Sequence, residues 1–117
     1  MNIAQLRRHA LSLPEVTEEP HHNFSSFRVR GKIFVTVPPD EVHVHVFVDE
    51  ATREQALAFD PEFLEKLLWG SKVVGLRVAL SAAKPNVVNE LVSKAWAHKA
   101  PKGLVAPPST AGRRPKP

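Results

Sequence analysis

The strictest constraint on the fold of this 117-residue chain is an alternating run at Glu41–Val48 (EVHVHVFV). Every second residue of the run is valine, and His43, His45 and Phe47 occupy the positions between the valines. Side chains of a strand point alternately to its two sides, so the valines share one side and the other three residues share the opposite one. Such clean alternation is typical of an antiparallel strand with one buried face. The run therefore predicts an antiparallel sheet that is covered on its valine side.

Apolar spacing elsewhere in the chain predicts three helices and further strands. Helices are expected over residues 2–13, 50–59 and from Pro85 onward, and strands over residues 24–30, 33–37 and 72–80. Asn2, with Gln5 three positions later, fits a cap of the first helix, and Asp49 or Thr52 fits a cap of the second. Residues 15–23 are polar and are expected to form a connection. The composition of residues 63–69 (FLEKLLW) favours a helix, although their shortness and the Gly-Ser that follows also allow a strand and a hairpin.

The turn between the first two predicted strands decides which side chains share a face. A three-residue loop, Arg30–Lys32, places Val29 opposite Ile33 and keeps the apolar sides together. A two-residue loop would bring the valines of the second strand beside Arg28, because a slip of one residue exchanges the faces. We therefore expect the three-residue loop. Phe34 has apolar neighbours on both sides, and both an exposed stacking position and a buried one stay open for it.

This order of elements predicts an α+β domain with two layers, in which helices cover one face of a single antiparallel sheet. Residues 1–99 are expected to form that domain, and residues 100–117 a Pro-rich basic tail without a fixed structure. The net charge of +4 comes entirely from this tail, because residues 1–99 carry twelve basic and twelve acidic residues. A basic domain surface as a whole is therefore excluded, and only local charge placement can attract a polyanion.

Several function classes lose support from what the sequence lacks. With no cysteine, disulfides and thiolate chemistry are excluded, and no serine lies in a G-x-S-x-G context. A G-x-G-x-x-G phosphate loop is also absent, so we expect neither an enzyme nor a bound cofactor. His43 and His45 have a spacing that two ligands of one metal can use, but no third ligand completes a site, and no metal is expected. Without a long apolar segment, we expect no membrane association and a cytoplasmic monomer or weak homo-oligomer.

The uncovered side of the predicted sheet is the candidate functional surface. It would present cationic and aromatic side chains together: Arg28, Arg30, Lys32, His43, His45, Phe47 and Arg77. Guanidinium groups bind phosphate in bidentate fashion, and an aromatic ring among them can stack on a base. These residues thus form a candidate nucleic-acid surface for weak, non-specific DNA binding. They also fit an ordinary solvated sheet face, and the same face could instead serve a protein- or small-ligand-interaction module without catalysis.

Short motifs along most of the chain carry a resemblance to a known family. They are ALSLP at residues 10–14 followed by acidic residues and Pro20-His21-His22, GKIF at 31–34, Trp69-Gly70, GLRVAL at 75–80 and AWAHKAPK at 95–102. Together they resemble the MmcQ/YjbR family of small bacterial proteins over residues 3–102. The resemblance implies the order α-β-β-β-α-β-β-α, with residues 63–69 as a strand. It also implies a DNA-binding role, because members are commonly labelled so, and it brings no catalytic or metal-binding residues.

Overall fold

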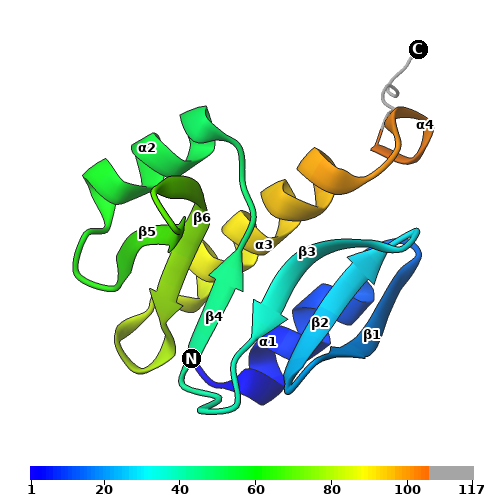
Figure 1. Ribbon diagram of the computed structural model, residues 1–117, viewed down its shortest axis with the longest axis horizontal. Coiled ribbons are helices and arrows are strands. Elements are labelled where there is room, and N and C mark those ends of the chain that lie inside the picture. Colours follow the sequence, from blue (N-terminus) through cyan, green and yellow to red (C-terminus); the bar gives the residue numbers. More distant parts are fainter. Residues whose placement is uncertain (106–117) are drawn as a thin grey trace.

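The computed structural model describes residues 1–105, in which a six-stranded antiparallel sheet is backed by helices (Figure 1). The elements are α1 (Ile3–Ser12), β1 (Val16–His21), β2 (Phe24–Val29), β3 (Lys32–Val37), β4 (His43–Val46), α2 (Glu50–Phe59), β5 (Leu64–Trp69), β6 (Lys72–Ala79), the 3₁₀ turn Leu80–Ala82, α3 (Pro85–Lys99) and α4 (Lys102–Val105). The strand order across the sheet is β1-β2-β3-β4-β6-β5.

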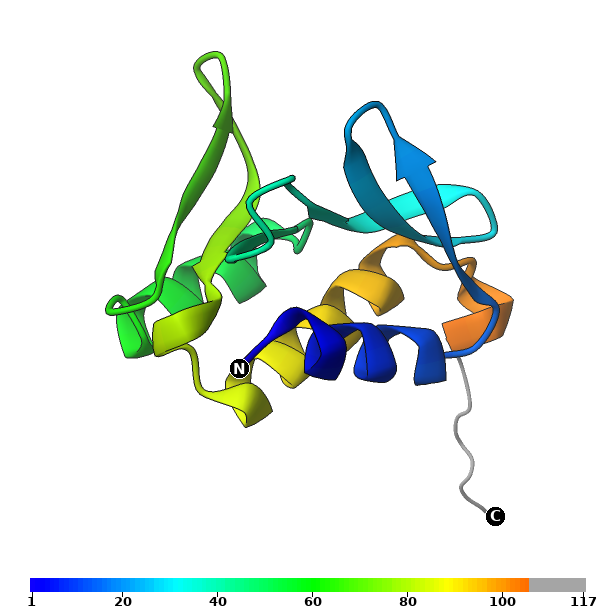
Figure 2. The same cartoon turned by 90° about the horizontal axis from the view of Figure 1, so that it is seen from below.

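All helices lie on one side of the sheet, as Figure 2 shows. Helix α3 crosses behind β3 and β4, α1 packs on α3 and β1, and α2 lies against β5 and β6. The valines of β4, Val44 and Val46, are fully buried against this layer, as their alternation predicts. The expected α+β class, with one sheet and helices on one face, is therefore confirmed.

Side-chain caps begin the first two helices where the sequence suggests. The Asn2 side chain accepts a hydrogen bond from the Gln5 amide (2.9 Å), and the Gln5 side chain accepts one from the Asn2 amide (3.0 Å). At α2 the cap is Asp49, which accepts from the Thr52 amide at 2.9 Å. Reciprocal pairing of this kind satisfies amides that would otherwise lack a partner in the first turn.

The predicted connection at residues 15–23 is wrong, because most of it forms the edge strand β1. Its residue pairs run from Val16 opposite Val29 to His21 opposite Phe24. Glu18 lies on the helix side, where its carboxylate binds the Arg7 guanidinium of α1 (2.9 and 3.1 Å). An edge strand needs hydrogen bonds on one side only and tolerates charged residues and proline, so its sequence lacks the apolar alternation of an inner strand.

The predicted three-residue turn between β2 and β3 is also wrong. Arg30 and Gly31 alone form the turn, both with positive φ (50° and 83°), so that Lys32 pairs with Val29. If this pairing continued along β3, its valines would lie on the helix-free side of the sheet. A β-bulge at Phe34 adds one residue to β3 and returns the valines to the helix side. Val35 lies opposite Phe27 in the core, and Phe34 itself is fully buried. Phe34 is therefore a core residue and offers no exposed stacking surface.

The remaining ambiguous segments have clear outcomes. Residues 64–69 form the strand β5, which pairs with β6 through a hairpin at Gly70, as the family resemblance implies. Residues 102–105 form α4, and Ala100 and Leu104 pack against the core, so the structured domain continues past residue 99. The rest of the predicted tail lies outside the described residues. Within residues 1–105, none of the helices has the length and apolarity needed to span a bilayer.

Candidate functional site

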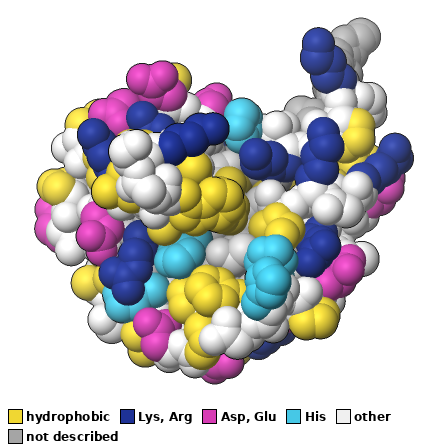
Figure 3. Space-filling model, in the orientation of Figure 1, with side chains coloured by type: hydrophobic (Ala, Val, Ile, Leu, Met, Phe, Trp, Pro, Cys, Tyr) yellow, Lys and Arg dark blue, Asp and Glu magenta, His cyan; other side chains and the backbone are white. Residues whose placement is uncertain are grey.

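The helix-free side of the sheet is hollowed into a trough of about 1090 Å³. Its two walls are the β1–β2 and β5–β6 hairpins, which rise from the sheet on opposite sides in Figure 2. The floor consists of Ile33 and Thr36 of β3, His45 of β4, and Phe47, which directly follows β4. In Figure 3 this side has hydrophobic side chains at its centre, histidines next to them, and Lys and Arg side chains around them. We call this hollow the trough.

Two pairs of aromatic rings line the trough. Phe47 of the floor meets Trp69 of the β5–β6 hairpin edge to face, with ring centroids 5.7 Å apart. On the other side, Phe24 of β2 reaches over the sheet to His45 of β4, with centroids 6.0 Å apart. Phe47 is only 8% exposed, whereas Trp69 is 63% exposed. Trp69 therefore offers a free ring surface beside an apolar floor.

Five of the seven predicted site residues lie on the helix-free side: Arg28, His43, His45, Phe47 and Arg77. His45 and Phe47 line the trough, and Arg28 and Arg77 lie opposite the lining residues Ile33 and His45. Their pairing places His45 between Thr36 and Arg77 on neighbouring strands. Arg28 donates to the Ser26 hydroxyl (3.0 Å) and to the Pro20 carbonyl (3.2 Å). Among the residues of 1–105, no carboxylate lies within ion-pair distance of the Arg28 guanidinium.

The other two predicted residues, Arg30 and Lys32, are placed elsewhere by the short turn. Arg30 lies in the turn and forms a bidentate ion pair with Glu15 (2.7 and 3.0 Å). The hydrogen bonds from Arg30 lower the pKa of the Glu15 carboxyl. Lys32 pairs with Val29, whose side chain is buried on the helix side, so the register gives Lys32 the side opposite Arg28. The sequence-based face joined these two residues to the others because it assumed the longer loop.

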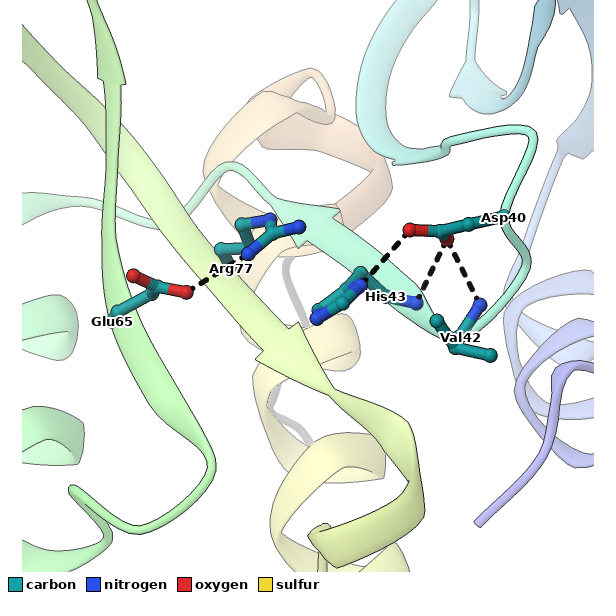
Figure 4. A network of polar contacts seen from close by, with 5 residues as sticks. All are labelled: Asp40, Val42, His43, Glu65 and Arg77. Carbon is teal, nitrogen blue, oxygen red and sulfur yellow. Dashed lines mark hydrogen bonds and ion pairs between the residues drawn. The ribbon is translucent and has the colours of Figure 1, made fainter.

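Two acid–base pairs lie side by side on neighbouring strands of the sheet (Figure 4). Arg77 of β6 donates to Glu65 of β5 at 3.0 Å, and the His43 ring of β4 bonds to Asp40 at 3.0 Å. The hydrogen bond from the Val42 amide is the largest cause of a lowered pKa of Asp40, and the bond to the His43 ring acts in the same direction. The Arg77 guanidinium and the His43 ring are thus each already held by a carboxylate.

In the trough floor, the folded structure disfavours protonation of His45 and so lowers its pKa. Burial is the main cause of its lowered pKa, and the positive charges of Arg77 and His43 act in the same direction against a smaller opposing effect of Asp40. The unfolded chain therefore binds a proton at a pH where folded His45 is still neutral, and the free energy of unfolding should fall as the pH drops below about 6.5. We expect His45→Gln to flatten this dependence in urea unfolding measured between about pH 5 and 7. An unchanged slope in the variant would contradict the assignment.

Sequence reasoning missed several residues that line the trough. Lys72 follows the β5–β6 turn, and Lys99 reaches the trough from the end of α3. No described carboxylate forms an ion pair with either lysine. Asp49 and Glu50 supply the acidic part of the lining at the start of α2. The sequence offered a local signal for Trp69, because an aromatic residue next to a turn glycine often lies at a hairpin end. No such signal exists for Lys99, whose position at the trough depends on how α3 crosses the sheet.

Histidines gather around the trough without forming a metal centre. His21, His22, His45 and His98 all line it. Across residues 1–105, no three or more His, Cys, Asp or Glu side chains are grouped so that they could hold a metal ion. The described geometry therefore presents cations, imidazoles and aromatic rings, which suit an anionic ligand with flat rings.

Comparisons with known proteins agree with this fold. The chain's fold resembles the crystal structure of the Deinococcus radiodurans protein DR2400, with domain family DUF419, at a TM-score of 0.76 and 18% identity, covering 95% of this chain and 93% of that chain. No curated protein matches the chain. The model of the YjbR family matches residues 11–98, which include every strand of the sheet, all of α2 and nearly all of α3, but only the end of α1. This match confirms the resemblance found in the sequence, and the chain belongs to the YjbR family.

Proposed function

We propose that this protein binds nucleic acid through the trough and the helix-free side of its sheet. The observation that carries the proposal is a set of cations on this side of the sheet that no described carboxylate neutralises. Lys72 and Lys99 line the trough, and Arg28 lies next to it, opposite Ile33 of the floor. The flexible ammonium groups of lysine and the planar guanidinium group of arginine both bind phosphate well. Arg77 and Arg30 contribute less, because each already binds a glutamate.

Phosphate contacts of this kind position a nucleic acid but carry no sequence information. Asp49 and Glu50 of the lining repel phosphate, so we expect the phosphates to contact Lys72, Lys99 and the neighbouring Arg28. With about three such contacts on a domain of balanced charge, we expect weak affinity that decreases steeply with salt and discriminates poorly among sequences.

Removing two of these cations tests the proposal. The double variant Lys72→Ala/Lys99→Ala should bind a labelled DNA strand more weakly, and the slope of log affinity against log salt should fall by about 0.7 for each lost contact. Fluorescence anisotropy titrations at several salt concentrations measure both quantities. The matched control is Arg8→Ala/Lys94→Ala, which removes the same charge from helices on the other side of the sheet.

Equal weakening in both double variants would contradict the proposed surface, because it would indicate net charge alone as the cause. A triple variant of the C-terminal cations, Arg113→Ala/Arg114→Ala/Lys116→Ala, separates the contribution of residues beyond the described part. If binding disappears with these three changes and is indifferent to Lys72 and Lys99, the domain itself has no DNA site.

A second candidate is a small-ligand or peptide site in the same trough. Its support is the apolar part of the lining, which Leu67, Val73 and Ile33 provide, together with the internal pairing of Arg77 and Arg30. Sites for small molecules are concave and mostly apolar, with a few polar groups that orient the ligand. Absence of DNA binding at low salt in the unmodified protein would favour this candidate.

A further inference from the structure

We propose that the trough takes single-stranded nucleic acid, whose unpaired bases stack on the two aromatic pairs of its lining. This inference rests on the proposed function and adds the form of the ligand. In a duplex the bases are stacked inside the helix, so a protein reaches only their edges and the phosphates. Single strands are recognised instead by aromatic rings on which splayed bases stack. Of the two forms of nucleic acid, a single strand is therefore the one whose bases can use the rings of the trough.

The first stacking position is the Phe47–Trp69 pair. The Trp69 ring is 63% exposed and stands at the end of the β5–β6 hairpin, while Phe47 closes the space below it. Leu68, beside Trp69, is 55% exposed and also lines the trough. Exposed Trp and Leu side chains at one hairpin tip cost solvation free energy, and a base that covers them recovers it.

The second position is the Phe24–His45 pair on the opposite side of the floor. His45 and Phe47 are two residues apart on the same side of the chain, so their backbone positions are about 6.7 Å apart. This is about twice the 3.4 Å rise between stacked bases of one strand. Two neighbouring bases on the two ring pairs would therefore be spread apart, which a single strand permits readily and a duplex permits only at the cost of unstacking its base pairs.

The cations lie where the backbone of such a strand would run. Lys72 follows the β5–β6 turn that Trp69 precedes, and Lys99 lines the same trough from α3. A base on Trp69 would leave its phosphate within the reach of Lys72, which pairs with Trp69 across the hairpin, and Lys99 offers a further phosphate contact in the same trough. The ring surfaces and the cations thus serve the same nucleotide from two sides.

The experiment compares one labelled DNA strand of mixed sequence, alone and annealed to its complement, in anisotropy titrations at equal salt with the full chain. We expect the single strand to bind at least about tenfold more tightly than the duplex. Trp69→Ala should lower affinity for the single strand by roughly tenfold and change duplex binding little, whereas Trp69→Phe should retain most of the affinity. Phe59→Ala, at a residue 73% exposed on α2, is the matched aromatic control and should bind as the unmodified protein does.

The possible outcomes distinguish failure of the stacking inference from failure of the proposed function. Equal binding of single strand and duplex, or single-strand binding that Trp69→Ala leaves unchanged, overturns the stacking inference while the phosphate-binding proposal stands. Absence of binding to both DNA forms at low salt overturns both proposals. Because Trp69 is largely exposed, urea unfolding of Trp69→Ala should match the unmodified protein, which separates loss of binding from loss of fold.

Discussion

Phe34→Ala should lower the free energy of unfolding by about 3 to 5 kcal/mol, a large part of the total stability of a domain of this size. The Phe34 side chain is fully buried and belongs to the central core, and its replacement leaves a cavity beneath the floor of the trough. Its backbone carbonyl also accepts a hydrogen bond from the Phe47 amide at 3.1 Å. The bulge therefore supports the same strand end that places Phe47 in the trough.

Urea unfolding followed by far-ultraviolet circular dichroism measures the effect, with the midpoint compared at an unchanged dependence on denaturant. Phe59→Ala makes the same chemical change at an exposed position and should shift stability by no more than about 0.5 kcal/mol. A loss below about 1 kcal/mol for Phe34→Ala would mean that Phe34 is not the core residue the structure describes.

Alternation predicted the centre of the sheet well, because burial of one face requires it. The valines of β4 and the alternating residues Leu76 and Val78 of β6 all lie in the core. Helix α3 was equally readable, since Pro85 at its start and a stripe of apolar residues at helical spacing need no information from the rest of the fold. Local physical chemistry is sufficient for these elements.

The register of the β2–β3 hairpin could not be predicted from alternation or other local patterns. A two-residue turn with a bulge and a three-residue turn without one both bring Phe27 and the later valine of β3 to the same side. The sequence favours the simpler solution, whereas the structure combines the positive φ of Arg30 and Gly31 with an extra residue at Phe34. Burial of Phe34 in the core distinguishes the two, and that burial depends on the complete fold.

The candidate site was predicted only in part for a related reason. Residues of inner strands, such as Arg28 and His45, were assigned to the correct side by alternation. Lys99 and Trp69 enter the trough from a helix end and a hairpin tip, and their position depends on the curvature of the sheet. Ion pairs between distant residues, such as Arg30 with Glu15, also escape sequence reasoning, yet they determine which cations are available to a ligand.

Gly75→Ala should destabilise the protein by about 3 kcal/mol, because the added methyl group has no space between β6 and β4. A Cβ at this position would lie 2.3 Å from the Val46 carbonyl oxygen and 3.2 Å from the Phe47 Cα, both of them backbone atoms. Backbone atoms of a paired strand cannot rotate away as a flexible side chain can, so the two strands would have to separate locally.

This local separation of β4 from β6 would occur next to Phe47 of the trough floor. Gly75→Ala should therefore also weaken the binding of single-stranded DNA by the fraction of the protein that stays folded. Gly103→Ala is the matched control: a Cβ there meets nothing within 4 Å, and alanine in the short helix α4 should leave stability unchanged or raise it by at most about 1 kcal/mol. Thermal and urea unfolding of the two variants make the comparison direct. If Gly75→Ala is as stable as Gly103→Ala, β4 and β6 do not approach as closely as the floor of the trough requires.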